Sequence, residues 1–234
     1  MSQTRGPDFA TGRSLPPVSQ FANDDGRVVP EVAAALAGYA AGRVAVSDLV
    51  EVLRGQRLLV PVLAHAEGHE TPTIVVGVTT ADGRTALPVF SSVDAMREWH
   101  PPARPIPVTT EQAAFAAIDE EWNILVLDPG GSSILFPRPA VVALMTGTPW
   151  QPAVADGKVA PEVVAAVSAT LAEIGSAQCE PGDRSELRIV VEIPAATPVA
   201  ERGELATAVT ALLAADHVVT QRVDSLEVVF RPGA

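Results

Sequence analysis

The residue pattern most suggestive of metal binding lies in residues 63–69. His65 and His69 are four residues apart with Glu67 between them, a spacing that could place two imidazoles on one face of a helix. Gly68 interrupts this stretch, which also follows an expected strand. We therefore predict a solvated loop here and no metal site.

The single cysteine, Cys179, is the only thiol nucleophile available. Its nearest charged neighbours, Glu180 and Asp183, are acidic and disfavour the thiolate, so we expect no catalytic role. One cysteine also excludes an intrachain disulfide and a zinc site built from cysteines. It is typical of a reducing compartment. Because residues 1–20 lack a continuous apolar core, we expect a cytoplasmic protein.

Residues 128–133, Asp-Pro-Gly-Gly-Ser-Ser, resemble a phosphate-binding loop only in their glycines. A Walker loop requires Gly-Lys-Ser/Thr before a helix, whereas this stretch has no lysine and leads into an expected strand. A tight turn is the simpler interpretation. The sequence also lacks a Ser-His-Asp order, a kinase motif set and a nucleophile elbow. We predict a protein without enzymatic activity and without a cofactor.

Charge and hydropathy exclude further classes of protein. The formal net charge is −12, and the 16 basic residues are dispersed, so we expect no nucleic-acid partner. A membrane-spanning helix needs about 20 mainly apolar residues. The best candidates, residues 163–174 and 205–215, are shorter, so we expect no membrane association.

Composition, turn and capping signals divide the chain into a disordered tail, residues 1–29, and two domains, residues 30–150 and 151–234. In the first domain, Ser47 is the expected N-cap of a short helix, Asp82-Gly83 predicts a hairpin, and Thr109 with Gln112 forms a capping box. The expected helices are residues 31–39, 47–53, 92–99, 109–120 and 139–145. The expected strands are 57–63, 73–79, 85–90, 123–127 and 133–136, with 100–107 as a loop or edge strand.

The second domain begins after a Gly-, Thr- and Pro-rich stretch, residues 147–157. Its pattern is helix 161–174, strand 187–193, helix 201–215 and strand 225–230. The predicted fold class is therefore α+β: a mixed, mainly antiparallel sheet with flanking helices, followed by a second, smaller two-layer α+β domain.

Three stretches of the first domain resemble the SseB (enhanced serine sensitivity) family. They are Val60-Pro61-Val62, the strand end Ala86-Leu-Pro-Val-Phe-Ser-Ser92, and the strand and turn Leu125-Val-Leu-Asp-Pro-Gly-Gly131. The likeness covers residues 30–150, and residues 151–234 are similar to the second domain of some members. Ser91 stands where threonine is usual in the family, and Asp128 where asparagine is usual.

The resemblance implies a bacterial protein without an established catalytic activity, linked to serine tolerance and acting through protein contacts. We therefore predict a protein-interaction or regulatory module with an unknown protein partner. Its interaction surface is expected to include an apolar patch and the turn. The candidate residues are Phe90, Trp99, Asp128, Gly130, Phe136 and Trp150.

Alternatives remain open at this point. Trp99, Trp122 and Trp150 each lie at an element boundary, where tryptophan most often packs at the rim of a core. A small molecule could bind, or be turned over, between the two domains, with Asp128, Arg138 and Cys179 as the residues to test. The chain could also be a secretion-linked or immunity-type partner protein. The sequence leaves a homo-oligomer open.

Overall fold

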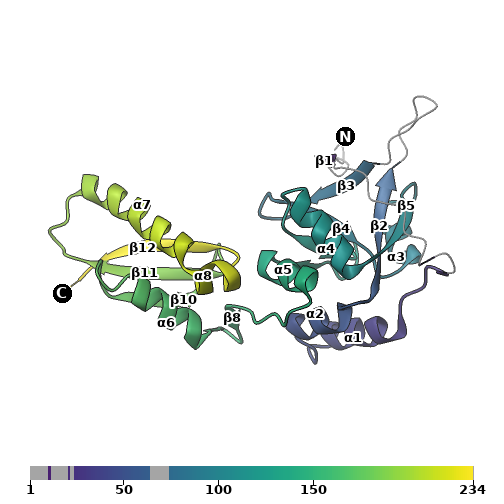
Figure 1. Ribbon diagram of the computed structural model, residues 1–234, viewed down its shortest axis with the longest axis horizontal. Helices are drawn as coiled ribbons and strands as arrows, with labels where there is room; N and C mark the ends of the chain where they lie inside the picture. The colour runs from purple at the N-terminus through teal and green to yellow at the C-terminus, as the bar shows by residue number, and fades with distance from the viewer. Residues whose placement is uncertain (1–9, 12–20, 22–23, 64–73, 234) are drawn as a thin grey trace, which may run out of the picture. The chain divides into compact units, whose positions relative to one another are not determined.

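The computed structural model describes residues 10–11, 21, 24–63 and 74–233. The chain divides into two compact units, Met1–Trp150 and Gln151–Ala234, each with its own sheet and its own hydrophobic core (Figure 1). The α+β class expected from the sequence is confirmed. None of the helices in the described part of the chain is long and apolar enough to span a bilayer.

The first unit combines a seven-stranded sheet with five helices among its described residues. The strands are β1 (Ala10–Thr11), β2 (Arg57–Leu63), β3 (Ile74–Thr79), β4 (Thr85–Val89), β5 (Arg104–Thr109), β6 (Leu125–Leu127) and β7 (Ile134–Phe136). The helices are α1 (Pro30–Ala40), α2 (Val46–Leu53), α3 (Val93–Trp99), α4 (Thr110–Asp119) and α5 (Arg138–Thr146).

The strand order is β5-β2-β3-β4-β6-β7, with β1 paired to β3. Every pairing is antiparallel except that of β4 with β6, which are joined through α3, β5 and α4. The expected hairpin at Asp82-Gly83 is confirmed, because β3 and β4 pair on either side of it. The parallel register aligns Val89 with Leu127, so both strands end at the same edge of the sheet. The residues that follow these two strands therefore come together.

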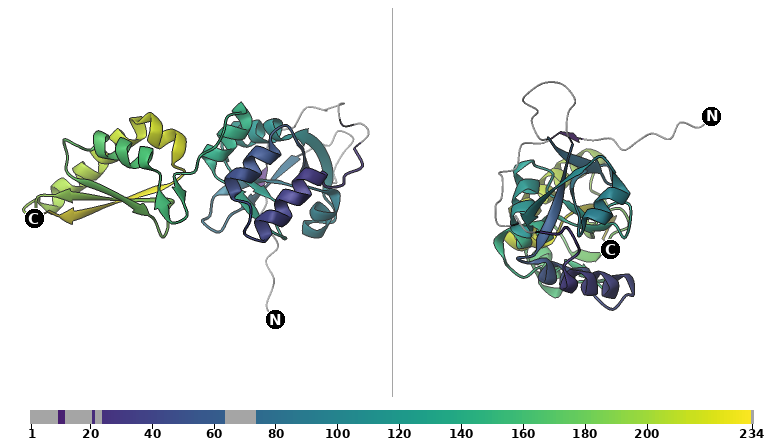
Figure 2. Two further views of the ribbon diagram at one scale, coloured as in Figure 1. Left: turned by 90° about the horizontal axis from the view of Figure 1, so that it is seen from below. Right: turned by 90° about the vertical axis from the view of Figure 1, so that its right-hand side faces the viewer.

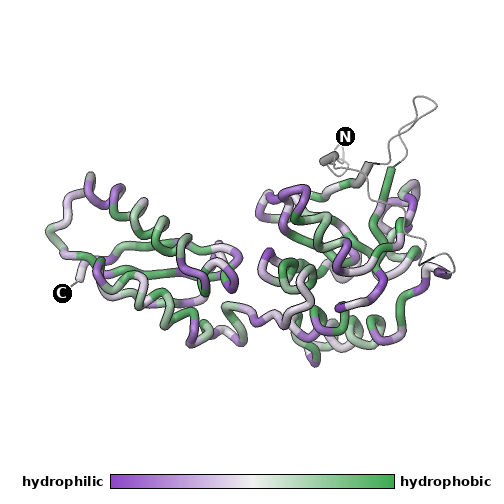
Figure 3. The backbone as a smooth tube through the Cα atoms, viewed as in Figure 1, coloured by the Kyte–Doolittle hydropathy of each residue, from purple (hydrophilic) through white to green (hydrophobic). Residues whose placement is uncertain are grey.

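Successive side chains along each strand point to opposite faces of the sheet, so the two faces carry different residues. Leu58 and Val60 of β2 pack into the main core together with side chains of α1, α2, α4 and α5. Leu59 points the other way and packs with Phe90 and with Met96 of α3. Four helices thus cover one face, whereas α3 is the helix that packs on the other (Figure 2). The nearly continuous apolar run of β2 (Figure 3) reflects this burial on both faces.

Two expectations for the N-terminal part of this unit are wrong. The disordered tail predicted for residues 1–29 does not hold for the residues described there, because Ala10–Thr11 form the strand β1 and Asp24 forms an ion pair with Arg57 on β2. Residues 1–9, 12–20 and 22–23 of that prediction lie outside the described residues. Ser47 is not an N-cap. Ala45 occupies that position, and its N–H donates to the carboxylate of Asp48 at 3.0 Å. An acidic side chain three residues into the helix thus replaces the serine hydroxyl expected from sequence.

The second unit contains a three-stranded sheet of order β10-β11-β12. β10 (Ala177–Pro181) is antiparallel to β11 (Leu187–Ile193), and β12 (Leu226–Pro232) is parallel to it. The helices are α6 (Pro161–Thr170), α7 (Val199–Ala215) and α8 (His217–Arg222), and the strands β8 (Val154–Ala155) and β9 (Lys158–Val159) form a small hairpin. The sequence patterns missed β8, β9, β10 and α8, which are short or carry polar residues at most positions.

Replacing either of two glycines of the second unit with alanine should change its free energy of unfolding, but in opposite directions. A Cβ at Gly175 would lie 2.1 Å from the main-chain oxygen of Glu192, so Gly175→Ala must displace the segment between α6 and β10. A Cβ at Gly203, inside α7, would meet nothing within 4 Å. We expect Gly175→Ala to lower the free energy of unfolding of this unit by roughly 2 kcal/mol. Gly203→Ala should raise it by about 0.5–1 kcal/mol.

The urea dependence of Cys179 labelling by a thiol reagent measures both changes. Cys179 lies on β10, and its partly buried side chain packs against the core of the second unit. Equal labelling midpoints for the two variants would contradict this prediction.

Candidate functional site

The end of β4 and the turn after β6 are joined through Ser91 and Asp128. The N–H of Ser91 donates to Asp128 Oδ1 at 2.8 Å, and the Ser91 hydroxyl donates to Asp128 Oδ2 at 2.7 Å. Each carboxylate oxygen thus accepts a hydrogen bond from the same residue. Next along the chain, Ser92 caps α3, accepting from the N–H of Ala95 at 3.1 Å. In the Phe-Ser-Ser sequence, Phe90 therefore lies in a hydrophobic core, Ser91 contacts the turn and Ser92 caps a helix.

The turn formed by residues 128–133 connects the two strands of the β6–β7 hairpin. Asp128 adopts a left-handed conformation, with φ at 49°, and its main-chain oxygen accepts from the N–H groups of Gly131 at 3.1 Å and Ser133 at 3.2 Å. Gly130, with φ at 99°, occupies a conformation that other residues rarely adopt. The interpretation as a turn, and not as a phosphate-binding loop before a helix, agrees with this geometry.

The Asp128 carboxyl group is held in a partly buried position. Burial raises its pKa above the usual 3.8, and the hydrogen bonds from Ser91 oppose that increase. Burial therefore outweighs the stabilising hydrogen bonds. A carboxylate whose two oxygens both receive hydrogen bonds from one neighbour is well suited to hold the strand end and the turn together.

A buried arginine extends this cluster toward the N-terminal segment. Arg57, at the start of β2 and 7 % exposed, donates from Nη1 to the Ser91 main-chain oxygen at 3.1 Å. Its Nε lies 3.0 Å from Asp24 Oδ2, and its Nη2 donates to the main-chain oxygen of Arg27. The polar cluster of Asp24, Arg57, Ser91 and Asp128 therefore ties together four segments that are far apart in the sequence.

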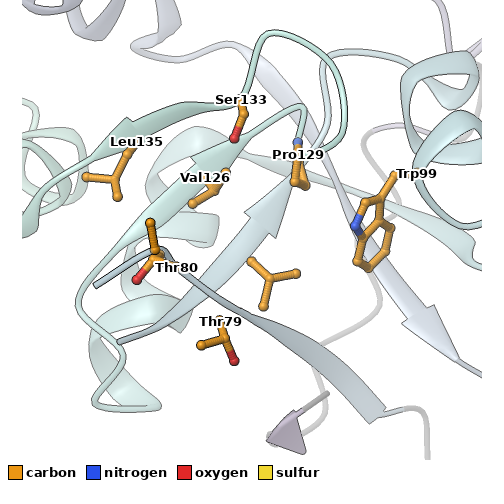
Figure 4. Close-up of a pocket in the computed structure, with 9 residues that line it drawn as sticks. Thr79, Thr80, Trp99, Val126, Pro129, Ser133 and Leu135 are labelled. Carbon is orange, nitrogen blue, oxygen red and sulfur yellow. The ribbon is translucent and has the colours of Figure 1, made fainter. Parts of the chain in front are cut away.

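Beside the turn lies an apolar groove of about 470 Å³ on the sheet face opposite the four helices. We call it the groove. In Figure 4, Trp99 lies at one end and Leu135 of β7 at the other, with Val126 of β6 between them. Leu135 is 37 % exposed because it points away from the core that buries Ile134 and Phe136. The remaining lining residues are Val78, Thr79, Thr80, Ala81, Pro129 and Ser133, so the lining contains no ionisable side chain.

The structure corrects the predicted interaction surface. Phe90 and Phe136 are 0 % and 1 % exposed, and Trp150 packs in the main core. Their inclusion in an exposed apolar patch is wrong, because alternation along the strands directs the two phenylalanines inward and the tryptophan ring fills the core. Trp99 is partly exposed and borders the groove. A Cβ at Gly130 would lie 3.6 Å from Trp99 Cδ1, so the turn and this indole are neighbours.

The other residues singled out from sequence belong to different units or lie outside the described residues. His65, Glu67 and His69 lie outside the described residues. Asp128 and Arg138 belong to the first unit and Cys179 to the second. Burial raises the pKa of the Cys179 thiol, which is the opposite of what an activated nucleophile requires.

Trp122 is half-buried at the rim of the main core, as tryptophans at element boundaries often are. Within the part of the chain that the structure describes, no three His, Cys, Asp or Glu side chains gather closely enough to hold a metal ion.

Sequence reasoning missed two features of this region. The first is the buried pair of Asp24 and Arg57, because Asp24 belongs to the stretch that was predicted to be a tail. An arginine directly before the apolar run of β2 was the available signal, because a buried guanidinium requires an acidic partner. The second is the groove, which forms from three separate stretches of the chain, residues 78–81, 99 and 126–135. The one local indication of the groove is Leu135, an exposed leucine between two buried residues of β7.

Two of the three family-like stretches, residues 86–92 and 125–131, thus meet in space at Ser91 and Asp128. Residues 32–143 also match the family model described as SseB protein N-terminal domain. The chain carries an SseB N-terminal domain. The matched residues run from within α1 to within α5 and include the groove and three members of the polar cluster, Arg57, Ser91 and Asp128. Comparison with curated proteins and with solved structures gave no match.

Proposed function

We propose that this SseB-domain protein has no enzymatic role and acts in the bacterial cytoplasm through protein contacts, with the groove as its binding surface. Its occupant is an extended segment of a partner protein that places apolar side chains between Trp99 and Leu135. The observation that carries the proposal is the lining, which is apolar with three hydroxyl groups and no ionisable side chain. The unpaired free thiol of Cys179 is compatible with a reducing compartment.

The chemistry of the lining favours peptide over substrate turnover. General acid–base or nucleophilic catalysis needs an ionisable or activated group within reach of the reacting atoms. Asp128 directly precedes the lining residue Pro129, and both of its carboxylate oxygens accept hydrogen bonds from Ser91. Apolar side chains, an indole and peripheral hydroxyls are instead typical of protein interfaces, where tryptophan often contributes most of the affinity.

Selection of binding peptides from a random phage-displayed library tests this proposal. Enriched peptides should carry two or more apolar side chains in an extended spacing. Leu135→Asp should weaken their binding at least about tenfold, because it places a charge in an apolar interface. Phe115→Asp is the matched control: Phe115 is 59 % exposed on α4, the helix whose other side packs in the main core, and this variant should bind within about twofold of wild type.

Two outcomes would contradict the proposal. One is a set of enriched peptides whose binding is reduced equally by the Phe115 and Leu135 variants. The other is a metabolite that raises the melting temperature of wild type but not of Leu135→Asp, while no peptide is enriched. That result would identify the groove as a small-molecule site.

A further inference from the structure

The outer edge of β12 in the second unit provides backbone groups for another strand. β12 is the last strand in the order β10-β11-β12, and it is seven residues long. The main-chain oxygen of Ser225 accepts from Leu187, and the N–H of Gly233 donates to Ile193, so these groups point toward β11. Because successive residues alternate, the groups of Leu226, Val228 and Phe230 point away from β11. No described residue pairs with this outer edge.

Long, apolar edge strands readily pair with another chain, and natural proteins usually protect them with a charge, a bulge or a cover. β12 reads Leu-Glu-Val-Val-Phe-Arg-Pro, with its proline at the end, so the central residues keep their donors. The other edge of this sheet, β10, is five residues long and has no basic residue. The two edges therefore differ in their capacity for pairing.

The sequence of β12 is complementary to itself in one antiparallel register. We propose that two copies of the chain pair through β12 about a two-fold axis at Val229, so that the two sheets become one of six strands. In this register Glu227 lies opposite Arg231 of the other copy, and this pair occurs twice. Val228 lies opposite Phe230, which places a β-branched residue beside an aromatic one on the side that packs against the helices.

Backbone geometry restricts the alternatives. Residues opposite each other must both direct their N–H and C=O groups across the interface or both away from it. Val228 and Phe230 do direct theirs outward, so they can exchange both hydrogen bonds, whereas Glu227 and Arg231 form the adjacent pair, which makes no main-chain hydrogen bonds and in which the two chains lie closer together. A shift of the axis to Val228 or to Phe230 keeps this rule but separates Glu227 from Arg231. Charge complementarity therefore selects Val229.

The face of the sheet that carries Glu227 and Arg231, opposite the side packed against the helices, already contains ion pairs. In the proposed dimer this row of charges continues across the interface. Arg188 on β11 lies 3.5 Å from Glu180 and 3.7 Å from Glu227, and Glu192 is next to Arg231 in the β11–β12 register. Across five of the six strands, the row then reads Glu180, Arg188, Glu227, and Arg231 and Glu192 of the second copy. Signs alternate along the row. In the next row Val229 lies beside its own copy, and Val190, which is 2 % exposed, lies beside Val229 in each copy.

Sedimentation equilibrium of the full chain measures the proposed dimer, and charge reversal tests its register. Arg231→Glu and Glu227→Arg should each weaken dimerisation at least about tenfold, because each turns two attractive pairs into two repulsive ones. A mixture of the two variants should dimerise about as tightly as wild type, since the Glu-Glu edge of one then faces the Arg-Arg edge of the other. This recovery also shows that both variants fold.

Disulfide trapping in a Cys179→Ser background gives a second measurement. Val229→Cys should form a covalent dimer on mild oxidation, because the two-fold axis places residue 229 beside its own copy. Glu227→Cys is the control, and it should not cross-link because its own copy is four residue positions away. A monomeric wild type at its highest soluble concentration, a mixture without recovery, or equal cross-linking at 227 and 229 would each overturn the proposal.

Discussion

Replacing Arg57 with methionine should lower the free energy of unfolding of the first unit by about 3 kcal/mol. Methionine preserves the apolar part of the side chain but removes the guanidinium that lies 3.0 Å from Asp24 and donates to the main-chain oxygen of Ser91. The Asp24 side chain is only 16 % exposed, so its carboxylate would remain largely out of water without its partner.

Urea unfolding followed by tryptophan fluorescence is a selective measurement of this effect. All three tryptophans, Trp99, Trp122 and Trp150, lie in the first unit. Arg97→Met is the control: the Arg97 side chain is 67 % exposed and pairs with Asp94 at 4.0 Å, so its loss should cost less than about 0.5 kcal/mol. Equal effects of the two substitutions would show that the Arg57 cluster contributes no more than a surface pair.

Replacing Asp128 with alanine should destabilise the first unit by a similar amount, about 3 kcal/mol. Two causes add. The N–H and the hydroxyl of Ser91, a residue that is 6 % exposed, lose their acceptors. Alanine must also adopt φ near 49°, a left-handed conformation that aspartate and asparagine tolerate better. The fluorescence experiment used for Arg57 gives the measurement.

Asp128→Asn separates the hydrogen bonds from the charge. The amide can accept from the Ser91 N–H and donate to its hydroxyl, so this variant should be at least as stable as wild type near neutral pH. Because the folded state raises the pKa of Asp128 above 3.8, the folded chain binds this proton more tightly than the unfolded chain. The contribution of Asp128 to the free energy of unfolding is therefore fully present at low pH, and it falls as pH rises through the interval above 3.8.

The stability difference between wild type and Asp128→Asn should consequently shift in favour of the asparagine variant as pH rises through that interval. A difference that is constant with pH, or that shifts the other way, would contradict the inferred effect of burial on Asp128. The experiment also tests whether this turn depends on hydrogen bonding alone.

The elements of the first unit could be predicted from sequence where local chemistry determines them. Asp82-Gly83 specified a hairpin, and Thr109 with Gln112 specified the start of α4, where both capping hydrogen bonds form. The turn at residue 128 was likewise identified by its proline and glycines. In these cases residues within four positions of each other decide the conformation, so the pattern is sufficient.

The candidate site could not be predicted in the same way, because its contacts join distant residues. Ser91 and Asp128 are 37 positions apart and meet because β4 and β6 are parallel neighbours, a pairing that no short pattern shows. Phe90 and Phe136 were expected at a surface because hydrophobicity alone does not say which face of a strand a helix covers. In the second unit, β10 was missed because its polar residues lie on the open face of the sheet.

The second sheet combines an antiparallel pair with a parallel pair, and this difference determines which of its strands can pair first during folding. β10 and β11 are neighbours in sequence and can pair as a hairpin, with little loop-closure entropy to overcome. β12 pairs with β11 only after α7 and α8 have been made and have crossed one face of the sheet. Until then β11, the central strand, has one unpaired edge. A nascent chain arrested before residue 226 should therefore be the species of this unit most prone to aggregate.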